Sequence, residues 1–161
     1  MPRIRDDVAE YGWHATAVGA GPDTPAFMYT TGLGASCSHP EVIVFGLDAK
    51  VCHRLLTDAV DDIRSGQSYA SPGIYEQLLA VPIAVRVVHP SQHCVYFADT
   101  LEFYRQTGSE EGFAAIQLFW PDRDGTFPFE AACDPGVFAA QPRLDLALPP
   151  SELEAFLRRN G

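Results

Sequence analysis

The sequence predicts a single α+β domain, in which a mainly antiparallel sheet of about five or more strands carries two main helices and a Pro-rich C-terminal tail. Its 161 residues fit one domain of the commonest size, and 47% of them are hydrophobic, which is enough to bury a real core. The apolar residues alternate in some segments and recur every three or four positions in others. This change of period indicates strands interspersed with helices.

Three strands are expected near the start of the chain, because three short apolar segments are separated by loops. Residues 12–18 (GWHATAV) alternate, and residues 26–32 (AFMYTTG) are rich in aromatic and β-branched side chains. Residues 41–46 (EVIVFG) contain four consecutive apolar residues, which indicates burial on both faces. The connecting segments are rich in Gly, Pro and Ser, so both connections are expected to be hairpin loops.

The first main helix is expected over residues 49–65. Asp48 is suited to the N-cap position, and Gly66 is a typical residue just beyond a helix end. The apolar face of this helix is formed by Val51, Leu55, Ala59 and Ile63. Residues 67–82 are expected to cross the domain irregularly, with a short helical turn.

The second half of the domain repeats the strand and helix signals. A fourth strand is expected at 83–89 (IAVRVVH), and the second main helix over 92–106, capped by Ser91. The fifth strand, 113–120 (FAAIQLFW), is the most apolar one.

The remainder of the chain is expected to be irregular. D-x-D-G at 122–125 predicts a turn with a positive φ at Gly125, in which Asp side chains bond to their own backbone. Prolines keep the following tail from being mostly helix, and a capping box formed by Ser151 and Glu154 starts a short helix through Arg159. Because no linker or repeat interrupts the chain, residues 1–161 are predicted to form one domain.

Charge and composition exclude several classes of function. The chain has 21 acidic and 11 basic residues, a net charge of −10, and its basic residues are scattered, so neither a nucleic-acid footprint nor attraction to an anionic membrane is expected. No apolar run approaches the ~20 residues of a membrane span, and the N-terminus lacks the apolar core of a signal peptide. We therefore expect a cytoplasmic protein, whose four cysteines stay as thiols.

Four motifs, in order, resemble one known family. They are GWH, FMYTTGL followed by HPEVIVFGL, VHPSQHCVYFADTLEFY, and QLFWPDRDGTFPFE. In this order they are similar to the bacterial domain of unknown function family 4262, over about residues 11–144. The resemblance implies a small bacterial cytoplasmic domain and implies no reaction, and residues 145–161 form a tail beyond it.

Histidines are the first candidates for a site, because imidazole titrates near neutrality and is the commonest metal ligand. Three of the five lie in the family-like motifs: His14 in GWH, His39 in HPE, and His93 at the start of the second helix. Capping or core histidines bonded to backbone are the favoured interpretation. The alternatives are general acid–base catalysis or ligand binding, and a metal site assembled from distant segments with Glu41, although no metal is predicted.

The turn residues give a second group of candidates. FMYTTGLGAS lacks the full glycine pattern of a dinucleotide loop and of a phosphate-binding loop, so it is interpreted first as a hairpin. It becomes a site if Tyr29, Thr30 and His39 turn toward His14. Asp122 lies at a strand end, where it could orient a histidine.

Two hypotheses for function follow. In the first, a small-molecule-binding or hydrolase-like domain holds His14, His39 and Asp122 as catalytic residues, and the ligand contacts are Tyr29, Thr30, Glu41, His93 and Trp120. In the second, a non-enzymatic interaction domain of the immunity or regulatory type docks a basic partner. Its acidic surface includes Asp58, Asp61, Asp62, Glu110 and Glu111. The sequence identifies neither a cofactor nor an oligomeric state.

Overall fold

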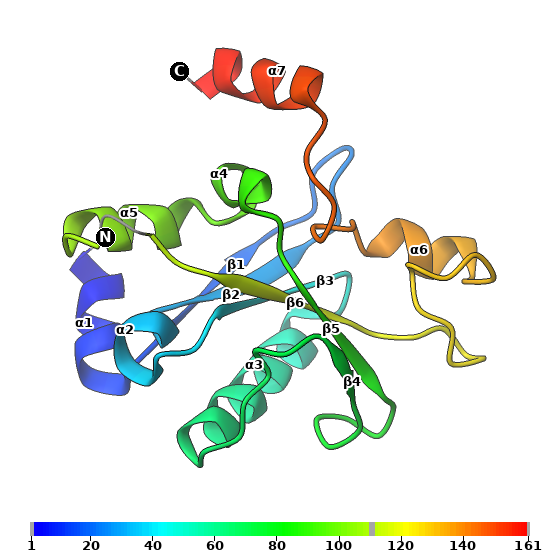
Figure 1. Ribbon diagram of the computed structural model, residues 1–161, viewed down its shortest axis with the longest axis horizontal. Helices are drawn as coiled ribbons and strands as arrows, with labels where there is room; N and C mark the ends of the chain where they lie inside the picture. The colour runs from blue at the N-terminus through cyan, green and yellow to red at the C-terminus, as the bar shows by residue number, and fades with distance from the viewer. Residues whose placement is uncertain (1, 110–111, 161) are drawn as a thin grey trace.

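The computed structural model describes residues 2–109 and 112–160. Within these residues a six-stranded sheet has the order β1-β2-β3-β6-β5-β4 (Figure 1). The strands are β1 (His14–Val18), β2 (Phe27–Thr31), β3 (Glu41–Phe45), β4 (Gly73–Tyr75), β5 (Ile83–Val87) and β6 (Ala115–Phe119). All five predicted strands are present, and the α+β class is confirmed.

The sheet is mixed, which corrects the expectation of a mainly antiparallel one. β3 and β6 pair in parallel at its centre, and the other neighbours pair antiparallel. Between β3 and β6 the chain passes through the helix 49–64, the β4–β5 pair and the helical region 90–106. Parallel neighbours need such a long crossover, so they lie far apart in the sequence. Their pairing therefore cannot be predicted from the order of the strands along the chain.

One face of the sheet is covered by α3 (Ala49–Arg64), as the sequence predicted. Asp48 caps it by accepting a hydrogen bond from the Lys50 N–H at 2.9 Å, and Gly66 follows its end with a φ of 102°. The side chains buried between α3 and the sheet include Met28, Val42, Val44, Leu55, Leu56, Ile116 and Leu118.

The opposite face is covered by the second helical region and by the tail. The helix expected over 92–106 is divided into η1 (Pro90–Gln92), α4 (His93–Tyr96) and α5 (Ala98–Gln106). The break is at Phe97, which has non-helical angles of −119° and 44° and whose ring is fully buried. The cluster on this face includes Phe27, Tyr29, Ile43, Phe45, Phe97 and Leu144.

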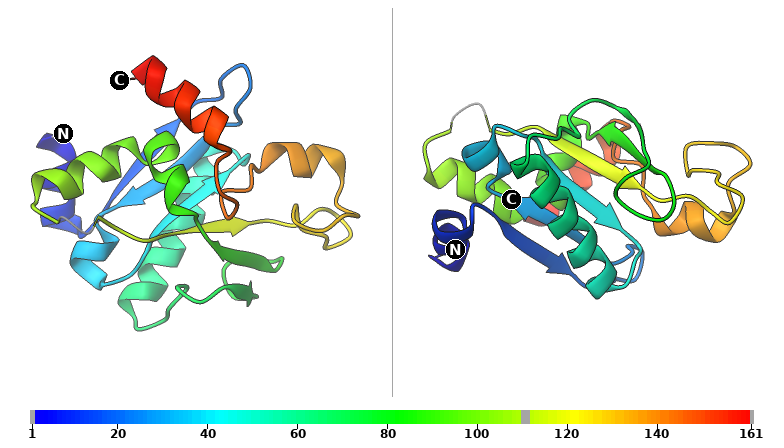
Figure 2. Two further views of the ribbon diagram at one scale, coloured as in Figure 1. Left: turned by 45° about the horizontal axis from the view of Figure 1, so that its top comes forward. Right: turned by 90° about the horizontal axis from the view of Figure 1, so that it is seen from below.

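The described residues contain more helices than the two expected. The additional ones are α1 (Pro2–Tyr11), α2 (Leu33–Cys37), α6 (Pro135–Ala140) and α7 (Pro150–Asn160), of which only α7 was predicted, as a short C-terminal helix. α7 stands off the sheet, and none of its side chains is buried (Figures 1 and 2). No helix in the described ranges has both the length and the apolarity to cross a bilayer.

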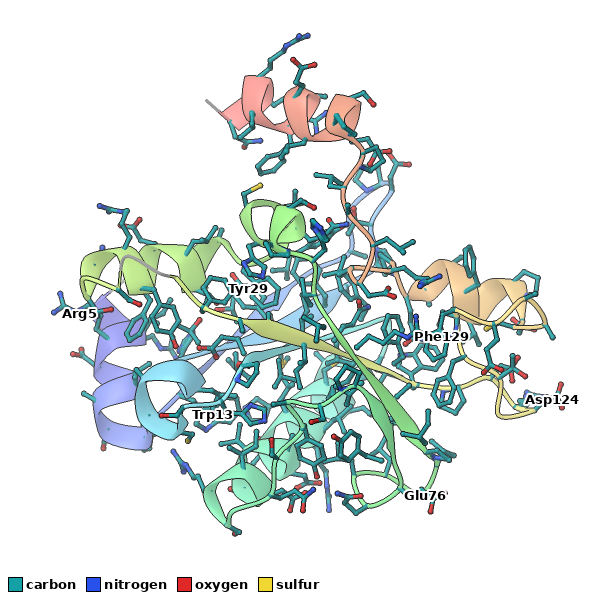
Figure 3. All side chains as sticks on the ribbon, in the orientation of Figure 1. Arg5, Trp13, Tyr29, Glu76, Asp124 and Phe129 are labelled. Carbon is teal, nitrogen blue, oxygen red and sulfur yellow. The ribbon has the colours of Figure 1, made fainter. Side chains whose placement is uncertain are left out.

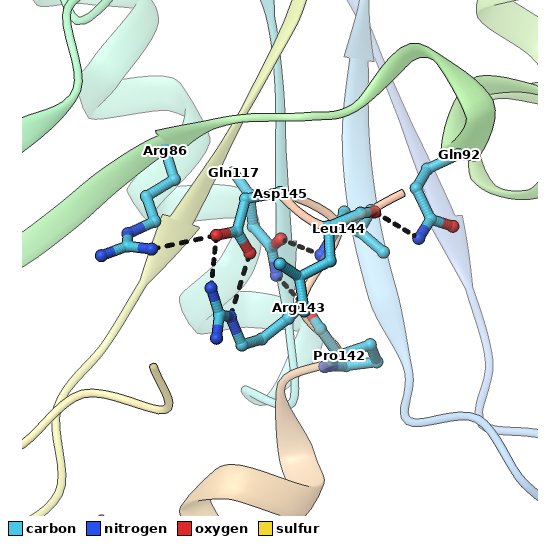
Figure 4. Close-up of polar contacts among 8 residues, drawn as sticks. Arg86, Gln92, Gln117, Pro142, Arg143, Leu144 and Asp145 are labelled. Carbon is cyan, nitrogen blue, oxygen red and sulfur yellow. Dashed lines mark hydrogen bonds and ion pairs between the residues drawn. The ribbon is translucent and has the colours of Figure 1, made fainter. Parts of the chain in front are cut away.

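The C-terminal tail is fastened to the sheet by glutamine side chains (Figure 4). Gln117 of β6 donates from Nε2 to the Pro142 carbonyl at 2.7 Å and accepts from the Leu144 N–H at 3.0 Å. Gln92 donates from Nε2 to the carbonyl of Leu146 at 3.0 Å. These amides satisfy the tail's backbone groups in place of a seventh strand, so the tail can close the core.

Candidate functional site

The most completely bonded side chain beside a pocket is Glu41, the first residue of β3. Its carboxylate is fully buried and accepts hydrogen bonds from the Thr30 hydroxyl at 2.7 Å and from the hydroxyl of Tyr104. It also accepts from the backbone N–H groups of Gly32, Leu33 and Gly34 at 3.1, 3.2 and 3.3 Å. Burial raises the pKa of Glu41, and these hydrogen bonds oppose that rise.

Two glycines permit this arrangement. Gly32 has a φ of 112°, and a Cβ there would lie 2.7 Å from a methyl group of Val8. A Cβ on Gly34 would lie 2.8 Å from the hydroxyl oxygen of Tyr104. The turn between β2 and β3 is therefore wound tightly into α2, which points its first N–H groups at the Glu41 carboxylate.

Tyr104 connects this network to α5. Its hydroxyl donates to Glu41 and accepts from the Ala35 N–H at 3.3 Å. Burial and the adjacent carboxylate both raise the pKa of Tyr104, so the phenol stays protonated as a donor.

A groove lies above this network, between α2 and the connection that follows α5. We call it the α2–α5 groove. It has a volume of about 570 Å³. Its walls include Gly34, Ala35, Ser38, His39, Tyr104 and Phe113. The Phe113 ring lies near-parallel both to the His93 ring, with centroids 4.5 Å apart, and to the Tyr104 ring, at 5.6 Å. One side of the groove is thus formed by the Tyr104 and Phe113 rings, and the His93 ring supports Phe113 from behind.

His39 lines the groove, and both of its nitrogens are bonded to backbone. Nδ1 lies 2.8 Å from the Pro40 carbonyl oxygen, and Nε2 accepts from the Tyr69 N–H at 3.0 Å. This pairing assigns the proton to Nδ1. Burial lowers the pKa of His39, which keeps the ring neutral. These two hydrogen bonds hold the His39 ring in place in the wall of the groove. They also link the end of the α2 turn to Tyr69, in the segment that follows α3.

His14 has different partners from His39. Its Nδ1 lies 2.7 Å from an Asp7 carboxylate oxygen of α1, and the strand register places it opposite Thr31. The Thr31 hydroxyl bonds Thr100 of α5, whereas the His39 partner Tyr69 packs on the α3 side of the sheet. The two histidines are thus directed to different neighbours, and His14 does not line the α2–α5 groove.

Tyr29, Thr30 and His93 lie near the groove without opening into it. The Tyr29 hydroxyl accepts from the Asp99 N–H at 3.2 Å, and its ring packs on Phe97. Figure 3 shows Tyr29 near α5. Burial raises the pKa of Tyr29. His93 lies behind Phe113, its Nε2 is buried without a hydrogen-bond partner within the described chain, and burial lowers its pKa.

Asp122 and Trp120 lie away from the histidines, in bonded positions of their own. Asp122 accepts from the N–H groups of Asp124 and Thr126 through Oδ1, and from that of Asp134 through Oδ2, at 2.9, 2.8 and 2.9 Å. These backbone N–H groups, that of Thr126 foremost, lower the pKa of Asp122. The predicted Asp turn is confirmed, with a φ of 80° at Gly125. Trp120 donates from Nε1 to the carbonyl of Phe45.

The expected acidic surface is partly used by internal contacts. Asp58 lies 3.9 Å from Arg54, and Asp62 accepts from the Tyr69 hydroxyl at 2.5 Å. Glu110 and Glu111 lie outside the described residues. Over 2–109 and 112–160, no group of three or more His, Cys, Asp or Glu side chains could hold a metal ion, and all four cysteines are unpaired.

Sequence reasoning missed Tyr104 and Phe113 as site residues. Tyr104 lies within the second expected helix, 92–106, and Phe113 within the fifth expected strand, 113–120, and neither was named as a site residue. One feature of the sequence could have indicated them: Glu41 directly precedes the four apolar residues of a buried strand. A carboxylate at the first position of such a strand is itself buried and needs hydrogen-bond donors from another element.

Comparison with curated proteins and with solved structures finds no match for this chain. A family model described as Domain of unknown function (DUF4262) matches residues 7–134. This match covers well over half of the chain and includes the β2–β3 turn, Glu41, Tyr104 and Phe113. The chain therefore belongs to the DUF4262 family.

Proposed function

We propose that the protein binds a small molecule in the α2–α5 groove. The observation that carries this proposal is a groove of about 570 Å³ set directly over the buried Glu41–Tyr104 pair. Pockets for small molecules fall in this range of volume, with apolar walls and a few polar groups that fix orientation. Residues with perturbed pKa values, such as Tyr104 here, are also concentrated at functional sites.

The walls suggest the kind of ligand. Phe113 is held between two other rings, so it offers a rigid apolar surface at little entropic cost. The hydroxyl of Ser38 is exposed at the rim and has no hydrogen-bond partner among the described residues. A ligand with an aromatic or heteroaromatic body and one polar substituent fits this combination.

Binding is favoured over hydrolysis because the candidate acid–base groups of the groove, His39 and Tyr104, are already bonded. A general base needs a free nitrogen or oxygen within reach of the substrate. Both nitrogens of His39 are bonded to backbone, and the Tyr104 hydroxyl is bonded to Glu41. We therefore propose binding and assign no reaction to the groove.

A fragment screen followed by amide chemical shifts tests the proposal. Aromatic and heteroaromatic fragments are added to the ¹⁵N-labelled protein, and hits should shift the amides of Ala35, Ser38 and Phe113. Ala35→Trp places an indole in the groove from an exposed position of α2, and it should abolish these shifts. The matched control is Ala139→Trp, an exposed position of α6 outside the groove.

Two results would contradict the proposal. One is a screen in which no fragment shifts the groove amides. The other is a set of shifts that Ala35→Trp leaves as large as in the parent protein, because the fragments would then bind elsewhere.

A further inference from the structure

A second hollow, separate from the α2–α5 groove, lies over β4 and β5. We call it the β5 hollow. Its volume is about 500 Å³, and its lining includes Ile74, Ala84, Arg86, Val87, Phe129 and Asp145. Arg86 and Ala84 alternate with residues that face α3, so the hollow lies on the face of the sheet that α3 leaves free.

Arg86 is held in one orientation by two neighbours. Its guanidinium carbon lies 3.7 Å from the centroid of the Phe129 ring, and its Nη1 donates to Asp145 Oδ2 at 3.0 Å (Figure 4). Arg143 donates to the same carboxylate, from Nε to Oδ1 at 3.1 Å and from Nη2 to Oδ2 at 2.6 Å. Two guanidinium groups therefore share one carboxylate, and the cluster keeps one net positive charge.

One edge of the Arg86 guanidinium has no partner. Phe129 covers a face of the group and Asp145 takes Nη1, while Nε and Nη2 have no hydrogen-bond partner within the described chain. The side chain is 39% exposed and lines the hollow. Nε–H and Nη2–H form a planar pair of donors whose spacing matches the two oxygens of a carboxylate.

Apolar side chains line the hollow beside this guanidinium. Ile74 is 53% exposed, is paired across the strands with Ala84, and lines the hollow together with it. A ligand that pairs with the guanidinium can therefore bury an apolar body at the same time. A dianion fits less well, because the Asp145 carboxylate already bonds the same guanidinium through Nη1 and the chain has a net charge of −10.

We propose that the β5 hollow binds a small monocarboxylate with an apolar body, through a two-point hydrogen bond to Nε and Nη2 of Arg86. Arg86 is fixed before the ligand arrives, so little side-chain entropy is lost on binding. This site does not depend on the α2–α5 groove, and either could be present without the other.

Titration with 2-naphthoate at neutral pH tests the proposal, with 2-naphthamide as the neutral analogue. Naphthoate should bind saturably and shift the amides of Ile74 and Val87, and naphthamide should bind at least about tenfold more weakly, because it lacks the charge-assisted pair. Arg86→Gln should weaken naphthoate binding by about tenfold or more. Arg86→Lys keeps the charge, loses the planar donor pair, and should also weaken binding.

Replacing Arg86 also removes a partner of Asp145, so a second variant that leaves Arg86 in place is needed. Ile74→Glu places a carboxylate in the hollow from an exposed position, and it should compete with naphthoate for the free edge. Arg123→Gln is the control: it makes the same change of net charge in an exposed turn and should leave the affinity unchanged. The proposal is overturned by the absence of saturable binding, by equal binding of naphthamide, or by affinity that Ile74→Glu does not reduce.

Discussion

The Tyr104 hydroxyl donates a hydrogen bond to the Glu41 carboxylate, joining residues 63 positions apart across the boundary between α5 and β3. This contact adds a donor from α5 to those that the carboxylate receives from Thr30 of β2 and from the backbone at the start of α2. It makes the floor of the α2–α5 groove a single bonded unit, which leads to the first two predictions.

Tyr104→Phe should destabilise the protein by about 1–3 kcal/mol, because Glu41 loses a donor and the Ala35 N–H loses its acceptor. Urea unfolding followed by circular dichroism measures the free energy of unfolding. Tyr11→Phe, at a residue that is 57% exposed, removes the same hydroxyl from the surface and serves as control. Equal stability of the two variants would contradict a structural role for the contact.

Glu41→Ala should cost more, about 3 kcal/mol or above, since Thr30, Tyr104 and three backbone N–H groups lose their common acceptor. The stability of Glu41→Gln should lie between those of this variant and the parent. The amide keeps one acceptor oxygen, but its NH₂ group faces donors and cannot accept from them. The same unfolding measurement ranks the three proteins. A Gln variant as stable as the parent would show that the carboxylate is protonated in the native state.

Stability should decrease as the pH falls below about 6.5, the ordinary pKa of histidine. Burial lowers the pKa of His39 and His93 in the folded state, so the unfolded chain binds protons first. The stabilisation is complete above pH ~6.5 and is lost as the pH falls from there toward the folded-state pKa values.

The contribution of His93 can be isolated with His93→Phe, which keeps an aromatic ring between Phe97 and Phe113. The difference in unfolding free energy between the parent and this variant should shift in favour of the variant as the pH is lowered from about 7.5 to about 5.5. Glu41 titrates in both proteins and cancels in the comparison. If the difference in unfolding free energy between the two proteins stayed constant with pH, the buried, neutral His93 would not be a source of the acid sensitivity.

Gln117→Leu should weaken attachment of the tail. It removes the donor to the Pro142 carbonyl and the acceptor of the Leu144 N–H, both of which belong to the Gln117 amide. Two unpaired backbone groups imply a loss of about 2 kcal/mol or more. Hydrogen exchange should show the Leu144 amide losing protection while the amides of β2 and β3 retain theirs. Gln106→Leu, at an exposed position of α5, is the control; uniform loss of protection would mean that the sheet itself had been damaged.

The strands and α3 could be predicted because their apolar periods are set by local sequence. α3 shows this most clearly: Asp48, the apolar stripe and Gly66 all indicate the same helix. α2 could not be predicted this way, since it is only five residues long and depends on Gly32 and on Glu41 as a buried acceptor. The parallel β3–β6 pair could not be predicted either, because it forms by tertiary packing between strands that are far apart in the sequence.

The candidate site was predicted only in part. Hairpin geometry brings His14 to the end of the sheet where β3 begins, as the register shows. Side-chain direction then separates it from His39, because Asp7 and Tyr69 bind the two rings on different segments. Glu41 was selected for its proximity to His39, and its main partner Tyr104 is distant in sequence. Such a pairing between distant segments is decided by packing and leaves no local pattern.

The glutamine-bonded tail has a consequence for where this chain can be shortened. The family model ends at residue 134, yet Leu144 is almost fully buried in the cluster with Phe27 and Ile43. A chain shortened to residue 134 would expose that cluster and leave both polar ends of the Gln117 amide in an open apolar face. A shortened chain that keeps this cluster covered should therefore extend past residue 134, to about residue 148, where the Leu148 N–H bonds the Ser91 hydroxyl.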